Sequence, residues 1–393
     1  MRYSLLARFA APLLAAVLIV PVAPARAADP YDIQAILPLT GQAAFIGKGD
    51  VNALNAIQAL INREGGIAGR PINFVVQDDQ SSPAVAVQLL TRVLTTNVPL
   101  VVGSTLGGIC NAMAPLVKDG PVELCFSPAF KATPGGFAFS AGVGTPDLMR
   151  AGMRFLIGRG YHRVALITST DATGQDADQN VNSVLALPEN KSVTVVDAEH
   201  FGINDITVSA QMARIKAANP DVVIAWTTGN PFGTVLHGAA DAGLAVPIFT
   251  TNGNMSFDQL KQYAPIMPKE LLFPGLPSLT PDQLPNGPLK RAVDTFRDAF
   301  AGNPQQPGAG ENQVWDLTLI MMNGLKRLGL NATATQLRDY ALNLKGYTGI
   351  YGPFDFNANP GRGVGIDGVI IQRWDPVKSA FVAVSAPGGA PMR

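Results

Sequence analysis

Six short turns of this sequence combine small residues with hydroxyl or amide side chains, and each follows an apolar run typical of a strand. They occupy residues 39–42, 103–108, 127–129, 171–175, 227–230 and 251–254. In parallel α/β sheets, ligands bind at the carboxyl ends of strands, where helix N-termini offer free N–H groups and a positive dipole end. Such turns can hold a carboxylate without Arg or Lys. Because small residues are common at any such turn, the prediction of a carboxylate site depends on the six turns together.

The usual catalytic signatures are missing or incomplete. Residues 47–52 read GKGDVN, with asparagine where the third glycine of a GxGxxG dinucleotide motif should stand. No GxxxxGKS or GxxxxGKT phosphate loop occurs, and residues 138–142 lack the first glycine of a nucleophile elbow. The three histidines, His162, His200 and His237, lie far apart in the sequence. We expect no catalytic residues and no cofactor. A general base need not be histidine, so an exported hydrolase stays an alternative.

Paired acidic residues follow two of the predicted strands. Asp78 and Asp79 precede a polar turn and a helix that begins at Pro83, and Asp171 and Asp176 bracket another turn. Carboxylates at such places can bind a metal ion, but they more often cap helices and close turns. We therefore expect capping here and predict no metal site.

The two cysteines, Cys110 and Cys125, favour a disulfide if the protein is exported. Metal ligation is the rival interpretation, but two cysteines without a nearby His or Asp make a poor site. Two unpaired thiols that simply pack in the core are the third possibility.

The first 27 residues have the features of a secretory signal peptide. Arg2 and Arg8 give a positive start, residues 9–22 form an apolar run, and residues 25–27 read ARA, a cleavage site of the A-x-A type. A transmembrane anchor would need about 20 apolar residues. No cysteine follows the run, so a lipid anchor is not predicted. We expect the mature protein to begin near Ala28 and to be periplasmic.

The remaining chain of about 365 residues exceeds the size at which single cores tend to split, which predicts two domains. Lys plus Arg equals Asp plus Glu at 29 each, so no net charge favours nucleic acid or an anionic membrane. Aromatic residues make up 7%, and no segment alternates basic and aromatic residues. We expect no nucleic-acid partner.

Short apolar runs alternate with helical segments along the chain, which predicts an α/β fold with parallel sheets. Strands are expected at residues 32–37, 72–77, 100–102, 122–126, 164–168, 193–197, 222–225 and 248–250. Helices are expected near residues 49–63, 83–96, 109–118, 147–159, 175–186, 207–218 and 232–242. Irregular stretches at 142–147, 274–288 and 345–349 predict three crossings between two discontinuous lobes.

Several blocks of the sequence resemble the periplasmic branched-chain amino acid binding proteins, which are solute receptors of ABC importers with a type I periplasmic binding fold. The blocks are PLTGQAAFIGKG, ALNAIQALINREGGIAGRPINFVVQDDQSSPAVAVQ, VPLVVGS, CFSPA, NPDVVIAW, GPFDFN and IQRWDP. Together they extend over essentially the whole mature chain. The resemblance implies two Rossmann-like lobes with parallel central sheets, joined by three hinge strands and closing over a small molecule.

The resemblance also implies domain boundaries and partners. Lobe 1 would comprise residues 28–143 and 278–347, and lobe 2 would comprise residues 144–277 and 348–393, with the ligand between them. The expected partners are a small carboxylate and an ABC permease in the inner membrane, and the protein is expected to be a monomer. A ligand sensor or regulator on the same fold is the main alternative.

For lobe 1, the resemblance implies ligand contacts at Ser104, Gly107 and Gly108, at Ser127 and Ala129, and at Phe45. The family usually has a serine where Gly107 or Gly108 stands, so backbone N–H groups become the expected donors there. Phe45 is expected against the apolar end of the ligand, and packing of helix against lobe is the alternative for it.

For lobe 2, the implied contacts are Thr173, Gly174, Gly229, Asn230, Thr251, Asn252 and Asn254. The family commonly has Tyr-Gly at Thr173-Gly174, and it has an acid near residues 251–254 that meets the ammonium of the ligand. Only amides and hydroxyls stand there in this sequence. A buried amine needs a compensating acid or several acceptors. Aromatic acids, aryl-keto acids and other apolar carboxylates are therefore expected candidates beside branched-chain amino acids.

Overall fold

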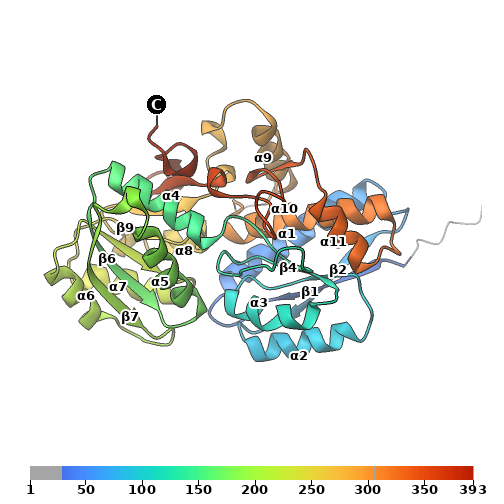
Figure 1. Cartoon of the computed structure of the whole chain (residues 1–393), viewed down its shortest axis with the longest axis horizontal. Helices are drawn as coiled ribbons and strands as arrows, with labels where there is room; N and C mark the ends of the chain where they lie inside the picture. Colours follow the sequence, from blue (N-terminus) through green and yellow to red (C-terminus); the bar gives the residue numbers. More distant parts are fainter. Residues whose placement is uncertain (1–28, 304–305, 393) are drawn as a thin grey trace, which may run out of the picture.

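Two α/β lobes lie side by side in the computed structural model, which describes residues 29–303 and 306–392 (Figure 1). The predicted signal peptide falls on residues outside the described part of the chain, so its prediction stays untested. The chain passes from lobe 1 to lobe 2, returns to lobe 1 and then crosses to lobe 2 a second time, so that each lobe is assembled from separate stretches of sequence. The two-lobed α/β fold with parallel central sheets is thereby confirmed.

Lobe 1 is built on a five-stranded parallel sheet of order β2-β1-β3-β4-β5. Alternate residues of β1 face opposite layers of helices: Ala35 and Leu37 pack in the same cluster as the α1 residues Leu54 and Ile57, whereas Ile36 packs with α2 and α3. Its elements are β1 (Tyr31–Leu37), α1 (Ala44–Arg63), β2 (Ile72–Asp78), α2 (Pro83–Leu94), β3 (Leu100–Val102), α3 (Gly107–Met113), β4 (Val122–Cys125), β5 (Ala138–Ser140), α9 (Pro288–Ala299), α10 (Ala309–Leu328) and α11 (Ala334–Leu342).

Lobe 2 is built on a seven-stranded sheet of order β14-β13-β10-β9-β8-β6-β7. The five strands from β10 to β7 are parallel, and β13 and β14 add an antiparallel edge that the sequence pattern did not predict. Its elements are α4 (Thr145–Gly158), β6 (Arg163–Ser169), α5 (Ala172–Leu185), β7 (Thr194–Phe201), α6 (Ser209–Ala217), β8 (Val222–Trp226), α7 (Asn230–Asp241), β9 (Ile248–Thr250), α8 (Phe257–Gln262), β10 (Leu271–Gly275), β13 (Ile370–Asp375) and β14 (Ala380–Ala383).

All eight predicted strands and seven predicted helices are present in the structure; the strands 100–102 and 248–250 have the predicted ends, and the other elements have shifted ends. Helix α1 begins at Ala44 rather than near residue 49, despite its two internal glycines. The predicted helix 109–118 is divided into α3 and a 3₁₀ turn at Ala114–Val117, with a proline in the first turn of the second piece. Proline removes a backbone donor, which explains the break.

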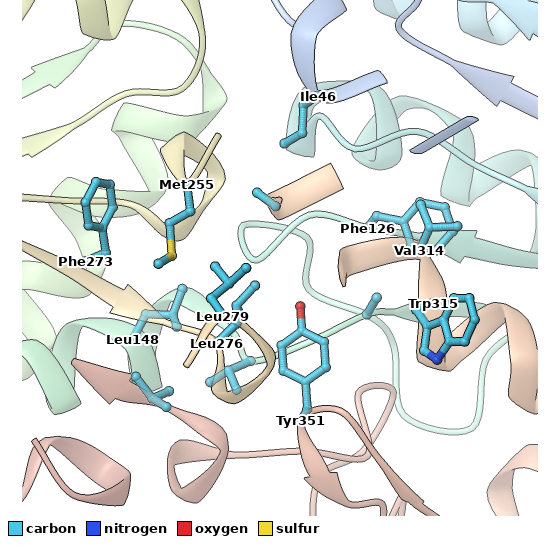
Figure 2. Packing of buried hydrophobic residues seen from close by; sticks show 14 of the residues in the cluster. Ile46, Phe126, Leu148, Met255, Phe273, Leu276, Leu279, Val314, Trp315 and Tyr351 are labelled. Carbon is cyan, nitrogen blue, oxygen red and sulfur yellow. The ribbon is translucent and has the colours of Figure 1, made fainter. Parts of the chain in front are cut away.

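Three segments join the lobes, at residues 141–144, 276–287 and 343–369. Figure 2 shows that apolar side chains of the second and third segments, Leu276, Leu279 and Tyr351, lie between Met255 of lobe 2 and Trp315 of lobe 1. The hydrophobic core is therefore continuous through the crossings.

The third crossing stays close to lobe 1 well beyond residue 347. The carboxyl group of Asp316, on α10, accepts the N–H groups of Ile350 and Tyr351 at 3.1 and 3.3 Å. Burial raises the pKa of Asp316 to about 7, although both donors act in the opposite direction. The short hairpin β11 (Thr348–Gly349) and β12 (Gly352–Pro353) is thus anchored to α10. The division of the chain into lobes at residue 347 stays a prediction.

Candidate functional site

A small cavity of about 30 Å³ lies between the lobes, at the carboxyl ends of strands from both sheets. By volume it has room for a very few water molecules, so the structure represents a nearly closed cleft. Lobe 1 contributes Ile46, Thr105, Leu106, Ser127, Pro128, Ala129 and Gln313, and the first residue of α4 in lobe 2, Thr145, also lines it. Lobe 2 contributes Thr173, Trp226, Thr228, Thr251 and Gly253.

Six of the thirteen residues that line this cavity carry hydroxyl groups, and none of the thirteen is charged. Thr105, Ser127, Thr145 and Thr251 are each at most 6% exposed. In the described residues, no group of His, Cys, Asp and Glu side chains is arranged to hold a metal ion. The inner cavity can therefore offer hydrogen bonds and an apolar wall, but no side-chain charge to pair with a ligand charge.

The turn after β3 carries Ser104, Gly107 and Gly108, which were predicted to hold the carboxylate of the ligand. Ser104 is fully buried and donates its hydroxyl to Asp79 at 2.7 Å, away from the lining of the cavity. A Cβ atom added at Gly107 would lie 3.0 Å from Ala129, and one at Gly108 would lie 3.5 Å from Ala172 of lobe 2. Gly107 therefore allows close approach to the turn at Ser127 and Ala129, whereas a Cβ at Gly108 would make only an ordinary contact with the opposite lobe.

The turn after β4 lines the cavity with Ser127, Pro128 and Ala129. Arg362, from the third crossing, holds this turn from behind, because its guanidinium donates to the carbonyl oxygens of Pro128 at 2.7 Å and of Phe130. The same guanidinium reaches the carbonyl of Gly142 in the first crossing at 3.3 Å. Burial lowers the pKa of Arg362 to about 10. Arg362 thus ties a turn that lines the cavity to the first and third crossings.

Lobe 2 faces the cavity with Thr173 at the start of α5 and with Trp226 at the end of β8. Trp226 is 2% exposed and packs on Phe249, with ring centroids 6.1 Å apart. It gives the cavity one aromatic wall. An aromatic ring at this position can contact a flat apolar ligand group.

Two of the predicted lobe 2 residues are engaged within their own lobe. The N–H of Gly174 donates to the Asp171 side chain at 3.2 Å, and a Cβ on Gly174 would lie 1.7 Å from the Ser169 carbonyl oxygen, so glycine is needed here for packing. The Asn254 amide is fully buried, donates to the Thr227 carbonyl at 2.8 Å, and accepts the Gly229 N–H at 3.2 Å.

A second, wider pocket of about 310 Å³ lies at the outer side of Ile46, which lines both spaces. Phe45 and Asn230, predicted as ligand contacts, line this outer pocket and not the inner cavity. Gln259 also lines it; this residue is 7% exposed, and its Oε1 has no hydrogen-bond partner. The outer pocket is therefore more open and more polar than the inner cavity.

Two contacts across the lobes define the closed arrangement. The N–H of Ala309, at the start of α10, donates to the Met255 carbonyl of lobe 2 at 3.0 Å. At the rim, a Cβ added to Gly229 would lie 2.5 Å from the Gln42 carbonyl oxygen and 3.5 Å from the Phe45 ring. Gly229 also has φ +90°, which favours glycine.

The structure thus brings four of the predicted ligand residues into one cavity: Ser127, Ala129, Thr173 and Thr251. Seven other predicted residues do not line this cavity, and their contact with a ligand stays a prediction: Ser104, Gly107, Gly108, Gly174, Gly229, Asn252 and Asn254. The sequence interpretation named the turn 103–108, which contains Thr105, but it missed Thr145, Trp226 and Gln313. Trp226 ends the quoted block NPDVVIAW, so its place after a strand was an available signal. Gln313 comes from a distant helix and carries no local signal.

Cys110 and Cys125 form a disulfide, as predicted, between α3 and the end of β4. The bond joins the helix that follows the turn with Thr105 to the strand that precedes the turn with Ser127. Replacing both cysteines by alanine is expected to lower the free energy of unfolding by about 3 kcal/mol, because the bond closes a loop of 15 residues. Urea unfolding of the variant measures this, with the wild type under reducing conditions as the control. A change below about 1 kcal/mol would contradict a stabilising role.

None of the helices in the described residues is long and apolar enough to cross a membrane. A family model described as "Periplasmic binding protein" matches residues 30–379. No curated protein matches the chain.

Several solved structures share the fold. A periplasmic binding protein type 1 from Bordetella pertussis is 19% identical, with a TM-score of 0.77 over 90% of this chain and 99% of that chain. A solute binding protein of an ABC transporter from R. palustris, in complex with benzoate, is 18% identical, with a TM-score of 0.73 over 91% and 97%. A branched-chain amino acid transporter substrate binding protein from Streptococcus pneumoniae, in complex with isoleucine, is 18% identical, with a TM-score of 0.76 over 90% and 98%.

Proposed function

Because the chain belongs to the periplasmic binding protein family, we propose that it is the solute receptor of an ABC importer and captures a small apolar or aromatic carboxylate between its lobes. One observation carries the proposal: an uncharged cavity, rich in hydroxyl groups, lies at the carboxyl ends of strands from both lobes. Hydroxyl and backbone N–H donors suit a carboxylate, and parallel sheets bind ligands at this edge.

The lining residues favour a ligand without an ammonium group. An amine enclosed in a closed cleft needs a carboxylate or several acceptors, and no acidic side chain lines the inner cavity. The buried wall formed by Trp226 suits a flat apolar group. Of the ligands bound by the two similar structures, benzoate fits these properties better than isoleucine does. Aromatic acids and aryl-keto acids are therefore our preferred ligands, ahead of branched-chain amino acids.

The proposed mechanism is hinge closure. The ligand would bind to one lobe in the open form, and contacts with the second lobe would then favour the closed form over the open one. The apolar layer at the crossings supplies the pivot, and the contacts Ala309–Met255 and Gly229–Gln42 are made only when the lobes meet. No bond in the ligand needs to change, so the role requires no catalytic group.

The same proposal gives the cellular setting. The signal peptide predicted for residues 1–27 would deliver the protein to the periplasm, where the closed form would dock as a monomer on a permease of the inner membrane. A neighbouring permease or ATPase gene would support the importer role over a sensor role.

A calorimetric titration tests the function. The protein is first unfolded and refolded to remove any bound solute, and is then titrated with benzoate, phenylpyruvate, leucine and isoleucine. We expect saturable binding of at least one aromatic carboxylate. Binding of leucine or isoleucine with no response to the aromatic acids would overturn the ligand preference, and hydrolysis of esters or amides by the protein would overturn the receptor role.

A further inference from the structure

Asp50 is a carboxyl group buried directly behind the wall of the cavity. It lies on α1 and is 0% exposed. Its Oδ2 is in hydrogen-bond contact with the hydroxyl of Thr105, which lines the cavity. Its Oδ1 is buried and has no hydrogen-bond partner among the described residues.

No basic side chain compensates Asp50. The charged groups that act on it are the carboxyl groups of Glu311, on α10, and Asp79, after β2, and both disfavour ionisation. The neighbouring Lys48 on its own helix is exposed, and no ion pair in the described residues includes Asp50. Burial, more than any other cause, raises the pKa of Asp50 well above its usual value, and the Thr105 bond only partly opposes this.

The position of the proton follows from the partners of the two oxygens. A proton on Oδ1 would have no acceptor, whereas a proton on Oδ2 can be donated to the Thr105 oxygen. When the carboxyl group donates to Thr105, the hydroxyl proton of Thr105 is free to point toward the cleft. If Asp50 were ionised, Thr105 would donate to it and would offer the cleft only a lone pair.

We propose that Asp50 is a positioning residue that keeps its proton and thereby makes Thr105 a hydrogen-bond donor to the carboxylate of the ligand. The inference rests on the proposed function and sharpens it, because the protonation state of one buried side chain decides the sign of ligand charge that the cavity accepts. Protonated Asp50 selects an anionic head group, and ionised Asp50 would select an ammonium or a hydroxyl donor.

Proton linkage follows from this arrangement. An anion binds the form in which Asp50 is protonated, so the affinity is constant at low pH and falls with rising pH once Asp50 in the free protein begins to ionise. The fall approaches tenfold per pH unit in that range, and each binding event then takes up a proton. Asp50→Asn keeps a donor toward Thr105 and cannot ionise, so its affinity stays constant with pH.

The test combines three variants with calorimetric titration of benzoate from about pH 6 to about pH 10. We expect Asp50→Asn to bind as tightly as the wild type or, at alkaline pH, more tightly. Thr105→Val is expected to lose about ten- to a hundredfold in affinity, because a hydrogen bond to a charged group is lost. Thr105→Ser keeps the hydroxyl and should restore most of the affinity. Wild-type affinity that rises with pH, or an Asp50→Asn loss as large as that of Thr105→Val, would overturn the inference.

A ligand-free measurement separates this inference from the proposed function. The infrared spectrum of the wild type minus that of Asp50→Asn should contain the carbonyl band of a protonated carboxyl group at neutral pH, and only carboxylate bands would contradict the inference. If Asp50→Asn does not fold, the infrared comparison is replaced by the number of protons that the wild type takes up on binding benzoate at alkaline pH. Calorimetry in buffers of different ionisation enthalpy measures this number. If no carboxylate binds the wild type, the proposed function fails, while the infrared result still decides the state of Asp50.

Discussion

Replacing Gly229 by alanine is expected to weaken ligand binding by about a hundredfold. The new Cβ would lie 2.5 Å from the Gln42 carbonyl oxygen of the opposite lobe, too close for the closed cleft to form without a shift. Since the clash with Gln42 exists only in the closed form, it destabilises the liganded closed state relative to the open state. Calorimetry with a ligand that binds the wild type measures the loss.

Gly160→Ala provides the matched control. Gly160 also belongs to lobe 2 and has a positive φ of +80°, but a Cβ at this position has no atom within 4 Å. Both variants should lose stability through backbone strain, and only Gly229→Ala should lose affinity. Equal affinities of the two variants would show that the rim contact does not limit closure.

Glu123→Gln is expected to stabilise the protein strongly at alkaline pH. Glu123 is the middle of β4, is 0% exposed, and neither of its carboxyl oxygens has a hydrogen-bond partner. Burial raises its pKa to about 8 from a usual value of 4.5. The folded state therefore holds a proton that the unfolded chain releases, so stability falls as pH rises from about 4.5 to about 8. The full shift corresponds to roughly 5 kcal/mol.

Glutamine stays neutral at every pH and removes this dependence. Wild type and Glu123→Gln should be nearly equal in unfolding free energy at about pH 4 and should diverge by a few kcal/mol at about pH 8. Denaturant unfolding across this range measures the difference, and taking the difference cancels the contributions of Asp79 and Asp316. Glu64→Gln, at an exposed position, should change stability by no more than about 0.5 kcal/mol. If the difference in unfolding free energy between wild type and Glu123→Gln were the same at every pH, the raised pKa of Glu123 would be contradicted.

The sheets could be predicted from the sequence because their strands are buried on both faces. In β8 every residue from Val222 to Trp226 is buried, and such a run is unusual outside parallel sheets. The antiparallel edge was harder to predict, because β13 and β14 follow the irregular third crossing and their pairing with β10 depends on distant sequence. Local sequence patterns predict where strands occur, but they do not predict which strands pair with one another.

The residues of the site also include some that the sequence could predict and some that it could not. Ser127 and Thr251 directly follow strands, so the edge of the sheet predicts their place at the cleft. Arg362 and Asp50 act through contacts with residues more than fifty positions away in sequence, at Pro128 and Thr105. No spacing or motif in the sequence predicts such pairs, because only the folded chain brings the two residues together.

Small-angle X-ray scattering of the solute-free protein, titrated with benzoate, tests the central claim most directly. If a small carboxylate is captured by closure of two lobes, the radius of gyration should fall as benzoate saturates the protein, and the final profile should match that of the closed structure described above. A profile that stays unchanged at saturating benzoate, with calorimetry reporting binding in the same sample, would contradict the claim.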